Sequence, residues 1–166
     1  MIQKKVALLG ASGVGKTSLV RRYVESLFDD AYLTTIGVKI DKKVVSAAGQ
    51  DVTLVLWDVA GAEERFSVPS SYVRGASGVL LVADGTRPET LAEAFDILDQ
   101  ITRDVGPLPY GLVLNKADLT EAWRIDEADA AGRAVVPIRV LRSSAKTGAG
   151  VDEAFGALAE AMLGGT

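Results

Sequence analysis

At residues 10–17 the sequence reads Gly10-Ala11-Ser12-Gly13-Val14-Gly15-Lys16-Thr17, which matches the pattern GxxxxGK[ST]. The stretch follows a short apolar run at residues 6–9 and opens a helical pattern through Leu19, Val20 and Tyr23. In this context glycines let backbone N–H groups curl around a phosphate, and the helix N-terminus adds partial positive charge. A glycine-rich turn followed by a surface lysine would show the same residues, but the flanking strand and helix patterns favour a phosphate-binding loop.

The residues of this loop have distinct expected roles. Lys16 is expected to meet the β and γ phosphates of a nucleotide, which makes it a candidate catalytic residue, and the Thr17 hydroxyl is expected to hold Mg²⁺. The predicted nucleotide-binding residues here are Gly13, Val14, Gly15, Lys16, Thr17 and Ser18.

The rest of the chain alternates between strand and helix patterns. Apolar runs recur at residues 79–82 and 112–114, and each is typical of a buried parallel strand. Residues at helical spacing lie between and after them: Leu91, Phe95, Leu98, Ile101 and Val105, and then Val151, Phe155, Leu158 and Met162. The pattern predicts one α/β domain over residues 1–166 with right-handed crossovers. Helix starts are expected at Pro88 and near Asp126, and a strand is expected over residues 135–141.

One segment departs from this alternation. Residues 39–47 and 51–58 are two extended stretches joined by Gly49-Gln50, with no room for a helix. This pair predicts an antiparallel hairpin at the edge of the sheet.

A second motif, Trp57-Asp58-Val59-Ala60-Gly61, ends the second stretch of the hairpin. Asp58 is a candidate for reaching the metal, through water, and the Gly61 amide is a candidate for contacting a γ-phosphate, which makes Gly61 a further candidate catalytic residue. Taken alone, DxxG is usually a turn at the end of a strand. Its place after a strand and its spacing from the phosphate loop favour the metal-binding role.

Two further motifs follow later strands. In Asn115-Lys116-Ala117-Asp118, the Asp118 carboxylate could accept hydrogen bonds from the N1 and N2 donors of guanine, a donor pair that adenine lacks. Asn115 would brace the phosphate loop and the Lys116 stem would lie over the purine, although an Asp or Asn here could equally be a helix N-cap. In Ser143-Ser144-Ala145-Lys146, the Ala145 amide could face the guanine O6. Ser144, Ala145 and Lys146 are therefore predicted nucleotide-binding residues.

Composition excludes several classes of function. The chain has no His and no Cys, which excludes a Ser-His-Asp triad, a thiol nucleophile and zinc sites built from those ligands. The net charge is −4 without a Lys- or Arg-rich run, so nucleic acid is not an expected partner. No lipid-anchor site or leader is recognisable, so we expect a cytoplasmic protein.

Together these motifs resemble the Ras superfamily of small GTPases, closest to the Rab branch. The stretches that carry the resemblance are GASGVGKTSLVRRY, TTIGVKI, WDVAG, SSYVRGA, NKAD and SSAKTG, in family order. The resemblance implies a P-loop NTPase G domain with a six-stranded, mostly parallel sheet and about five helices. It implies GTP and GDP as ligands, Mg²⁺ as cofactor, two switch segments, and an effector, an exchange factor and an activating protein as partners.

The same resemblance implies roles for three residues before the hairpin. Phe28 would pack edge-on against the guanine, Tyr32 would lie over the phosphates, and Thr35 would coordinate Mg²⁺ in the GTP state and take part in catalysis. Thr34 is the neighbouring competitor for the metal, and the TIG register favours Thr35.

Two features depart from the family. The position of the catalytic glutamine is Ala62, which cannot orient a water, and phosphate would repel Glu63 or Glu64 if an insertion placed either there. Slow hydrolysis is expected unless a partner supplies the missing group. The chain ends soon after its last helix pattern, without a lipidated cysteine, which favours a prokaryotic Ras-like protein, although a trimmed chain would look the same.

Three functions fit these observations. The first is a GTP/GDP switch, in which the γ-phosphate holds Thr35 and Gly61 and orders both switch segments. The second is a scaffold that binds GTP and scarcely hydrolyses it. The third is a small P-loop kinase or ATPase, which the guanine-type motifs and the short chain disfavour.

Overall fold

The computed structural model describes residues 2–25, 38–59, 70–134 and 140–164 of the chain. Six strands lie in these residues: β1 (Ile2–Leu9), β2 (Val38–Ala47), β3 (Gln50–Val59), β4 (Gly78–Asp84), β5 (Tyr110–Asn115) and β6 (Val140–Arg142). The five described α-helices are α1 (Lys16–Glu25), α2 (Ser70–Val73), α3 (Glu89–Val105), α4 (Glu127–Gly132) and α5 (Val151–Gly164), with a short 3₁₀ helix at Thr120–Ala122.

The six strands form one sheet in the order β2-β3-β1-β4-β5-β6. β1 pairs in parallel with both β3 and β4, and β4-β5 and β5-β6 are also parallel pairs. β2 and β3 pair antiparallel from Val38↔Val59 to Ala47↔Gln50. The mostly parallel α/β sheet and its antiparallel edge hairpin, both predicted from the sequence, are therefore confirmed.

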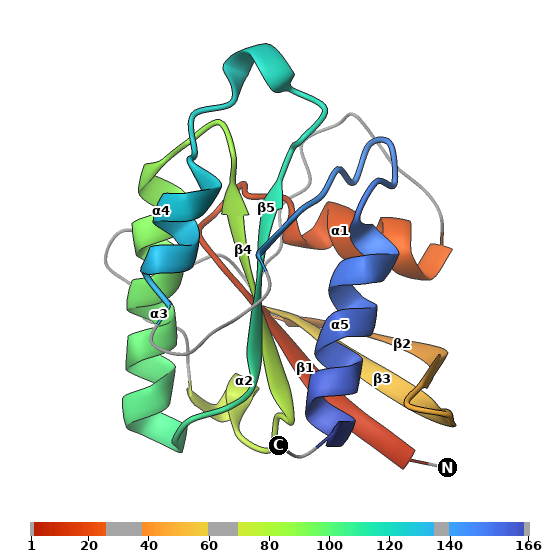
Figure 1. Ribbon diagram of the computed structural model, residues 1–166. Helices are drawn as coiled ribbons and strands as arrows, with labels where there is room; N and C mark the ends of the chain where they lie inside the picture. The colour runs from red at the N-terminus through yellow and green to blue at the C-terminus, as the bar shows by residue number, and fades with distance from the viewer. Residues whose placement is uncertain (1, 26–37, 60–69, 135–139, 165–166) are drawn as a thin grey trace.

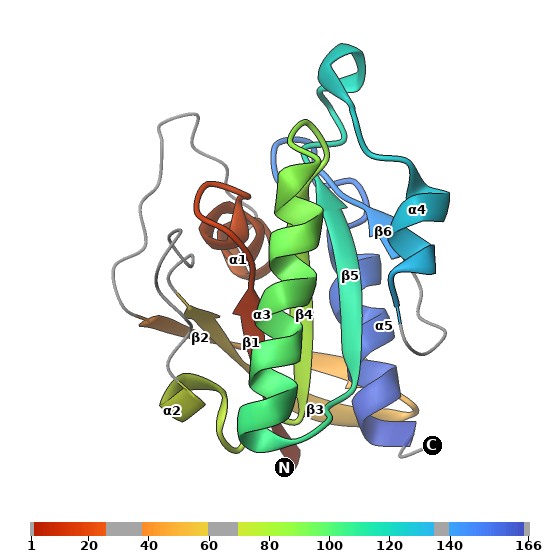
Figure 2. The ribbon, with the colours of Figure 1, turned by 90° about the vertical axis from the view of Figure 1, so that its left-hand side faces the viewer.

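Helices cover both faces of the sheet (Figures 1 and 2). α1 and α5 lie on one face, where Leu19, Phe155 and Leu158 pack with Leu54 and Leu80 of the sheet. α2, α3 and α4 lie on the other face, where their apolar side chains pack with the opposite side of β1, β4 and β5. β4 is central, and all seven of its residues are buried, as its continuous apolar run predicted.

The helix boundaries have local causes. Asp126 precedes α4 with extended backbone, and its carboxylate accepts a hydrogen bond from the Ala128 N–H at 2.9 Å, so the helix predicted near Asp126 begins at Glu127. Pro88 is the N-cap of α3, close to its predicted position. The strand predicted over residues 135–141 is described only from Val140, because residues 135–139 lie outside the described residues.

This topology gathers polar residues along the carboxyl ends of the parallel strands. Asp58, Asp84 and Asn115 lie at or near the carboxyl ends of β3, β4 and β5, and Ser143 directly follows β6. The loop at residues 10–15 follows the carboxyl end of β1, on the side of the sheet where ligands bind in open α/β folds. Within the described ranges, no helix has the length and apolarity that a membrane crossing requires.

Candidate nucleotide-binding site

The loop between β1 and α1 has a backbone that only glycine adopts readily. Gly13 has φ +78° and Gly15 has φ +102°, both in the left-handed region. A Cβ on Gly15 would also lie 2.3 Å from Nδ2 of Asn115. The backbone of this loop therefore passes against the Asn115 side chain, at a distance that leaves no room for a larger residue.

Lys16 begins α1 and is 5% exposed. Its Nζ donates to the carbonyl oxygens of Gly10 at 3.1 Å and Ala11 at 3.3 Å, both of which are neutral acceptors. Burial lowers the pKa of Lys16 to about 8, although the Asp58 carboxylate opposes this shift. A buried ammonium held by neutral oxygens is well placed to gain from an added anion such as a phosphate.

Thr17 and Asp58 lie beside this lysine. The Thr17 hydroxyl donates to Oδ2 of Asp58 at 2.6 Å, which joins the start of α1 to the end of β3. Hydroxyl and carboxylate oxygens suit Mg²⁺, which binds through a few protein oxygens together with waters and substrate phosphates. Within the described residues, no group of three or more acidic, His or Cys side chains is arranged to hold a metal ion.

Asn115 joins the loop after β5 to the phosphate loop, as the sequence predicted. Its Nδ2 donates to the Val14 carbonyl at 2.9 Å, and its Oδ1 accepts from Ser143 Oγ at 3.1 Å. Asn115 is 2% exposed and Ser143 is fully buried. These two hydrogen bonds connect three loops that are far apart in the sequence.

Asp118 and Ser144 meet across the two base-reading motifs. Ser144 Oγ donates to Oδ1 of Asp118 at 2.8 Å, and the Thr147 N–H donates to the same Ser144 Oγ at 3.1 Å. Asp118 therefore bonds to the neighbouring loop, not to the start of a helix, which argues against the N-cap alternative. Ala145 is buried and Lys146 is exposed.

Arg22, Asp84 and Arg87 were not predicted as site residues from the sequence. Arg22 of α1 donates through Nε to the Ala145 carbonyl at 3.0 Å and through Nη2 to the Lys146 carbonyl. Asp84 receives Lys116 Nζ at 2.9 Å and Arg87 Nε at 3.0 Å. Asp84 had a recognisable signal, because it ends a buried strand just as Asn115 does, whereas Arg22 had none.

The Lys116 side chain makes contacts that the motif did not predict. Besides the ion pair with Asp84, its Nζ donates to the Gly13 carbonyl at 3.0 Å, so its head contacts the phosphate loop. Its backbone has φ +70°. The predicted position of its stem over a purine remains a prediction.

Comparison with known proteins gives the family of this chain. The model of the Ras family matches residues 5–164. The chain belongs to the Ras family of small GTPases. The "GTP-binding protein YPTM1" of Zea mays is 37% identical over 160 residues, covering 95% of this chain and 77% of the relative. "Ras-related protein Rab-13" of Canis lupus familiaris is 34% identical over 161 residues, covering 96% and 79%, and Rab-13 of Bos taurus is 35% identical over 162 residues, with the same coverage. The Rab-like resemblance is thus confirmed.

Several residues that the sequence singled out lie outside the described part of the structure. They are Phe28, Tyr32, Thr34, Thr35, Gly61, Ala62, Glu63 and Glu64. The nucleotide contacts, Thr35 as a metal ligand, and the catalytic roles expected of Thr35 and Gly61 therefore remain predictions.

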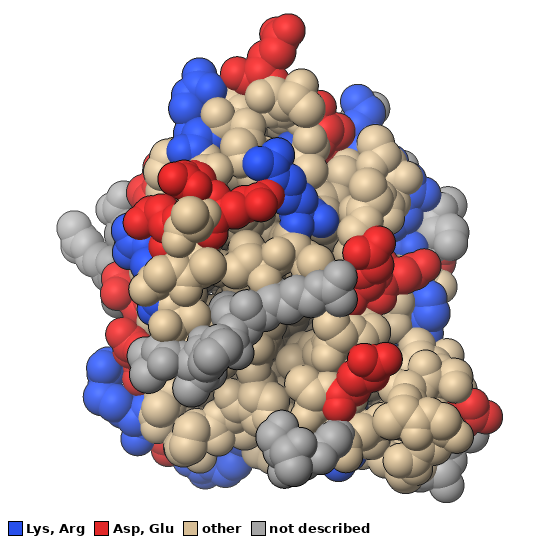
Figure 3. Space-filling view, viewed as in Figure 1, with Lys and Arg blue, Asp and Glu red and all other residues tan. Residues whose placement is uncertain are grey.

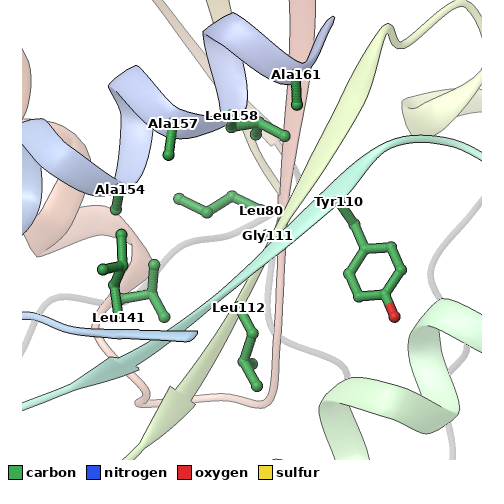
Figure 4. Close-up of a pocket in the computed structure, with 10 residues that line it drawn as sticks. Leu80, Tyr110, Gly111, Leu112, Leu141, Ala154, Ala157, Leu158 and Ala161 are labelled. Carbon is green, nitrogen blue, oxygen red and sulfur yellow. The ribbon is translucent and has the colours of Figure 1, made fainter. Parts of the chain in front are cut away.

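A cavity of about 180 Å³ lies between the sheet and α5, among residues that include Leu80, Tyr110, Leu141, Ala157 and Leu158 (Figure 4). None of the described residues that line it is charged. Its lining therefore offers no charged side chain to a phosphate. On the face shown in Figure 3, described Lys and Arg side chains are interspersed with Asp and Glu and form no continuous basic stripe.

Proposed function

We propose that this Ras-family protein is a guanine-nucleotide switch that binds GTP and GDP with Mg²⁺ and hydrolyses GTP slowly. The observation that carries the proposal is the bond between Asn115 and the Val14 carbonyl, with Asp118 and Ser144 beside it. It ties the motif that would read guanine to the loop that would hold its phosphates. The Zea mays relative is named a GTP-binding protein, which agrees with this assignment.

In this proposal each described group has one task. The backbone amides of Gly13, Val14 and Gly15 and the Lys16 ammonium bind the phosphates. The Thr17 hydroxyl holds Mg²⁺, with Asp58 linked to it through water, and the metal neutralises charge on the phosphates. Asp118 accepts from guanine N1 and N2, and the Ala145 amide donates to O6.

A scaffold that holds GTP with little hydrolysis is the second candidate. The observation that favours it is Ala62, because alanine has no amide to orient the attacking water. In the switch proposal, by contrast, an activating protein would supply the missing group, and an effector and an exchange factor would complete the cycle. A cytoplasmic location belongs to the same proposal.

Single-turnover hydrolysis, with the nucleotide identified by chromatography, separates the two candidates. We expect wild-type turnover at or below the roughly 10⁻⁴ s⁻¹ scale of unstimulated Ras-type enzymes. The variant Ala62→Gln should be faster, because it restores the water-orienting amide. Retention of GTP with no turnover in either protein would favour the scaffold.

Glu63→Ala tests the competing assignment, in which the Glu63 carboxylate is the catalytic group. If fast wild-type turnover collapsed in Glu63→Ala, the adjacent carboxylate would be the catalytic group and the role given to position 62 would be wrong.

A further inference from the structure

Asp84 is a buried carboxylate that none of the roles proposed above uses. It ends β4 and is 1% exposed. It accepts from the Thr86 N–H at 2.9 Å, Thr86 Oγ1 at 2.7 Å, Arg87 Nε at 3.0 Å and Lys116 Nζ at 2.9 Å. Burial alone would raise the pKa of Asp84, but the hydrogen bonds from Thr86, Lys116 and Arg87 outweigh it and hold the pKa below its usual value. Asp84 is therefore an ionised anchor for two cations.

Both cations extend from Asp84 to the phosphate loop. Arg87 Nη2 donates to the Ser12 carbonyl at 3.0 Å, and Lys116 Nζ donates to the Gly13 carbonyl at 3.0 Å. Asn115 Nδ2 holds the next carbonyl, that of Val14. Three consecutive carbonyls of the loop therefore accept hydrogen bonds from side chains at the ends of β4 and β5.

Because the trans peptide is planar, these contacts fix the direction of the N–H groups in the loop. In each peptide unit the C=O of one residue and the N–H of the next point in opposite directions. Holding the carbonyls of Ser12, Gly13 and Val14 toward β4 and β5 turns the N–H groups of Gly13, Val14 and Gly15 the other way. A run of such N–H groups forms an anion-binding concavity. The side chains behind the loop thus set the direction of the amides that would face phosphate.

Arg87 is held in place for this contact by its own turn. Thr90 is fully buried, and its Oγ1 donates to the Arg87 carbonyl at 2.7 Å and accepts from the Asp84 N–H at 2.8 Å. The Arg87 N–H donates to the Asp84 carbonyl at 2.9 Å. The Arg87 side chain itself is 40% exposed, so truncating it removes the contact with Ser12 and leaves no sealed cavity.

We propose that Arg87, anchored by Asp84, is a positioning residue for nucleotide binding. It fixes the Ser12 carbonyl so that the Gly13 N–H faces phosphate, and it thereby slows nucleotide release. The inference rests on the proposed guanine-nucleotide binding, and it assigns Arg87 no contact with the nucleotide itself.

The test is the release of a fluorescent GDP analogue from the full chain in Mg²⁺, chased with excess GDP. Arg87→Ala should release it about tenfold faster, the factor that one charge-assisted hydrogen bond supports. Arg87→Lys should fall between the two, because a single ammonium cannot reproduce the planar two-sided contact of a guanidinium. Arg103→Ala is the matched control, because Arg103 is an exposed arginine in the last turn of α3, and its release should equal that of the wild type.

A phosphorus NMR spectrum of bound GDP supplies a readout that a purely structural role would not move. The β-phosphate resonance should shift in Arg87→Ala and stay unchanged in Arg103→Ala. Unchanged release and an unchanged resonance in Arg87→Ala would overturn the inference, as would equal acceleration in both variants. If the wild type retained no GDP analogue, the proposed function would fail and this inference with it. Retention by the wild type with no effect of Arg87→Ala would overturn the inference alone.

Discussion

In the proposed site, Asp118 is the residue to which we assign base selectivity. It is held by Ser144 at 2.8 Å, on a loop that Asn115 ties to the phosphate loop. Two charge-assisted bonds to guanine predict that Asp118→Ala weakens GDP binding by roughly tenfold or more. Asp118→Asn should favour xanthine nucleotides, because an amide can donate to the oxygen that xanthine carries in place of the guanine amino group. Nucleotide competition measures both, and equal wild-type affinity for ATP and GTP would contradict the assignment.

Gly15 offers a test of the loop backbone. Gly15→Ala combines an unfavourable φ of +102° with a Cβ placed 2.3 Å from Asn115 Nδ2. Gly49→Ala, in the hairpin turn, has a similar φ of +77° but nothing within 4 Å of its Cβ. Backbone strain should cost each variant about 1–2 kcal/mol of unfolding free energy. Gly15→Ala should lose more than Gly49→Ala, because its Cβ must displace the buried Asn115 side chain. Only Gly15→Ala should also weaken nucleotide binding, because it displaces Asn115. Urea unfolding and GDP titration separate the two effects, and equal GDP affinity of both variants would contradict this account.

Helix α1 links the phosphate loop to the second base-reading loop through Arg22. The Arg22 guanidinium donates to the carbonyls of Ala145 and Lys146. The loop that would present the Ala145 amide to the guanine O6 is therefore fixed by a helix that starts at Lys16. Arg22→Ala should weaken GDP binding about three- to tenfold, since one or two charged hydrogen bonds are lost.

The control for Arg22 is its neighbour Arg21, whose ion pair is with Glu25 at 3.8 Å. Arg21→Ala should leave GDP affinity nearly unchanged. A purine diphosphate without the 6-oxygen should lose less affinity than GDP in Arg22→Ala. If it lost as much, Arg22 would act on the fold in general and not on the O6 contact.

The two faces of the sheet predict unequal costs of losing an aromatic side chain. Phe155 of α5 is 1% exposed and stacks on Tyr23 of α1 with ring centroids 4.1 Å apart, so it joins two helices to the sheet. Phe95 of α3 is only partly buried and meets Tyr110 edge-on at 6.5 Å. Phe155→Ala should lose about 3–5 kcal/mol of unfolding free energy and Phe95→Ala clearly less. Urea unfolding measures both, and equal losses would show that α5 is not the better packed helix.

For the whole molecule, the sequence determined the class of fold and which residues are candidates for the site. The glycines at residues 10–15, the apolar run of β4 and the short turn at Gly49 are local signals, because backbone conformation and strand burial depend on the residues of one segment. These signals were enough to predict the mostly parallel sheet and the edge hairpin. The Asn115 bond to the phosphate loop was predicted from a separate motif, Asn115-Lys116-Ala117-Asp118.

Only the tertiary structure decided how the site is held together. Arg22, Arg87 and Lys116 donate to backbone carbonyls of residues 75 to 124 positions away. Most side-chain hydrogen bonds go to backbone or water. Because every residue has the same backbone carbonyl, the residue type of the acceptor does not reveal such a bond. The sequence could place Asp84 at the end of a buried strand. The contacts of Arg87 and Lys116 with Asp84 and with the phosphate loop could not be predicted. They form only because β1, β4 and β5 lie side by side, so they depend on the order of strands in the sheet and not on the residues of any one segment.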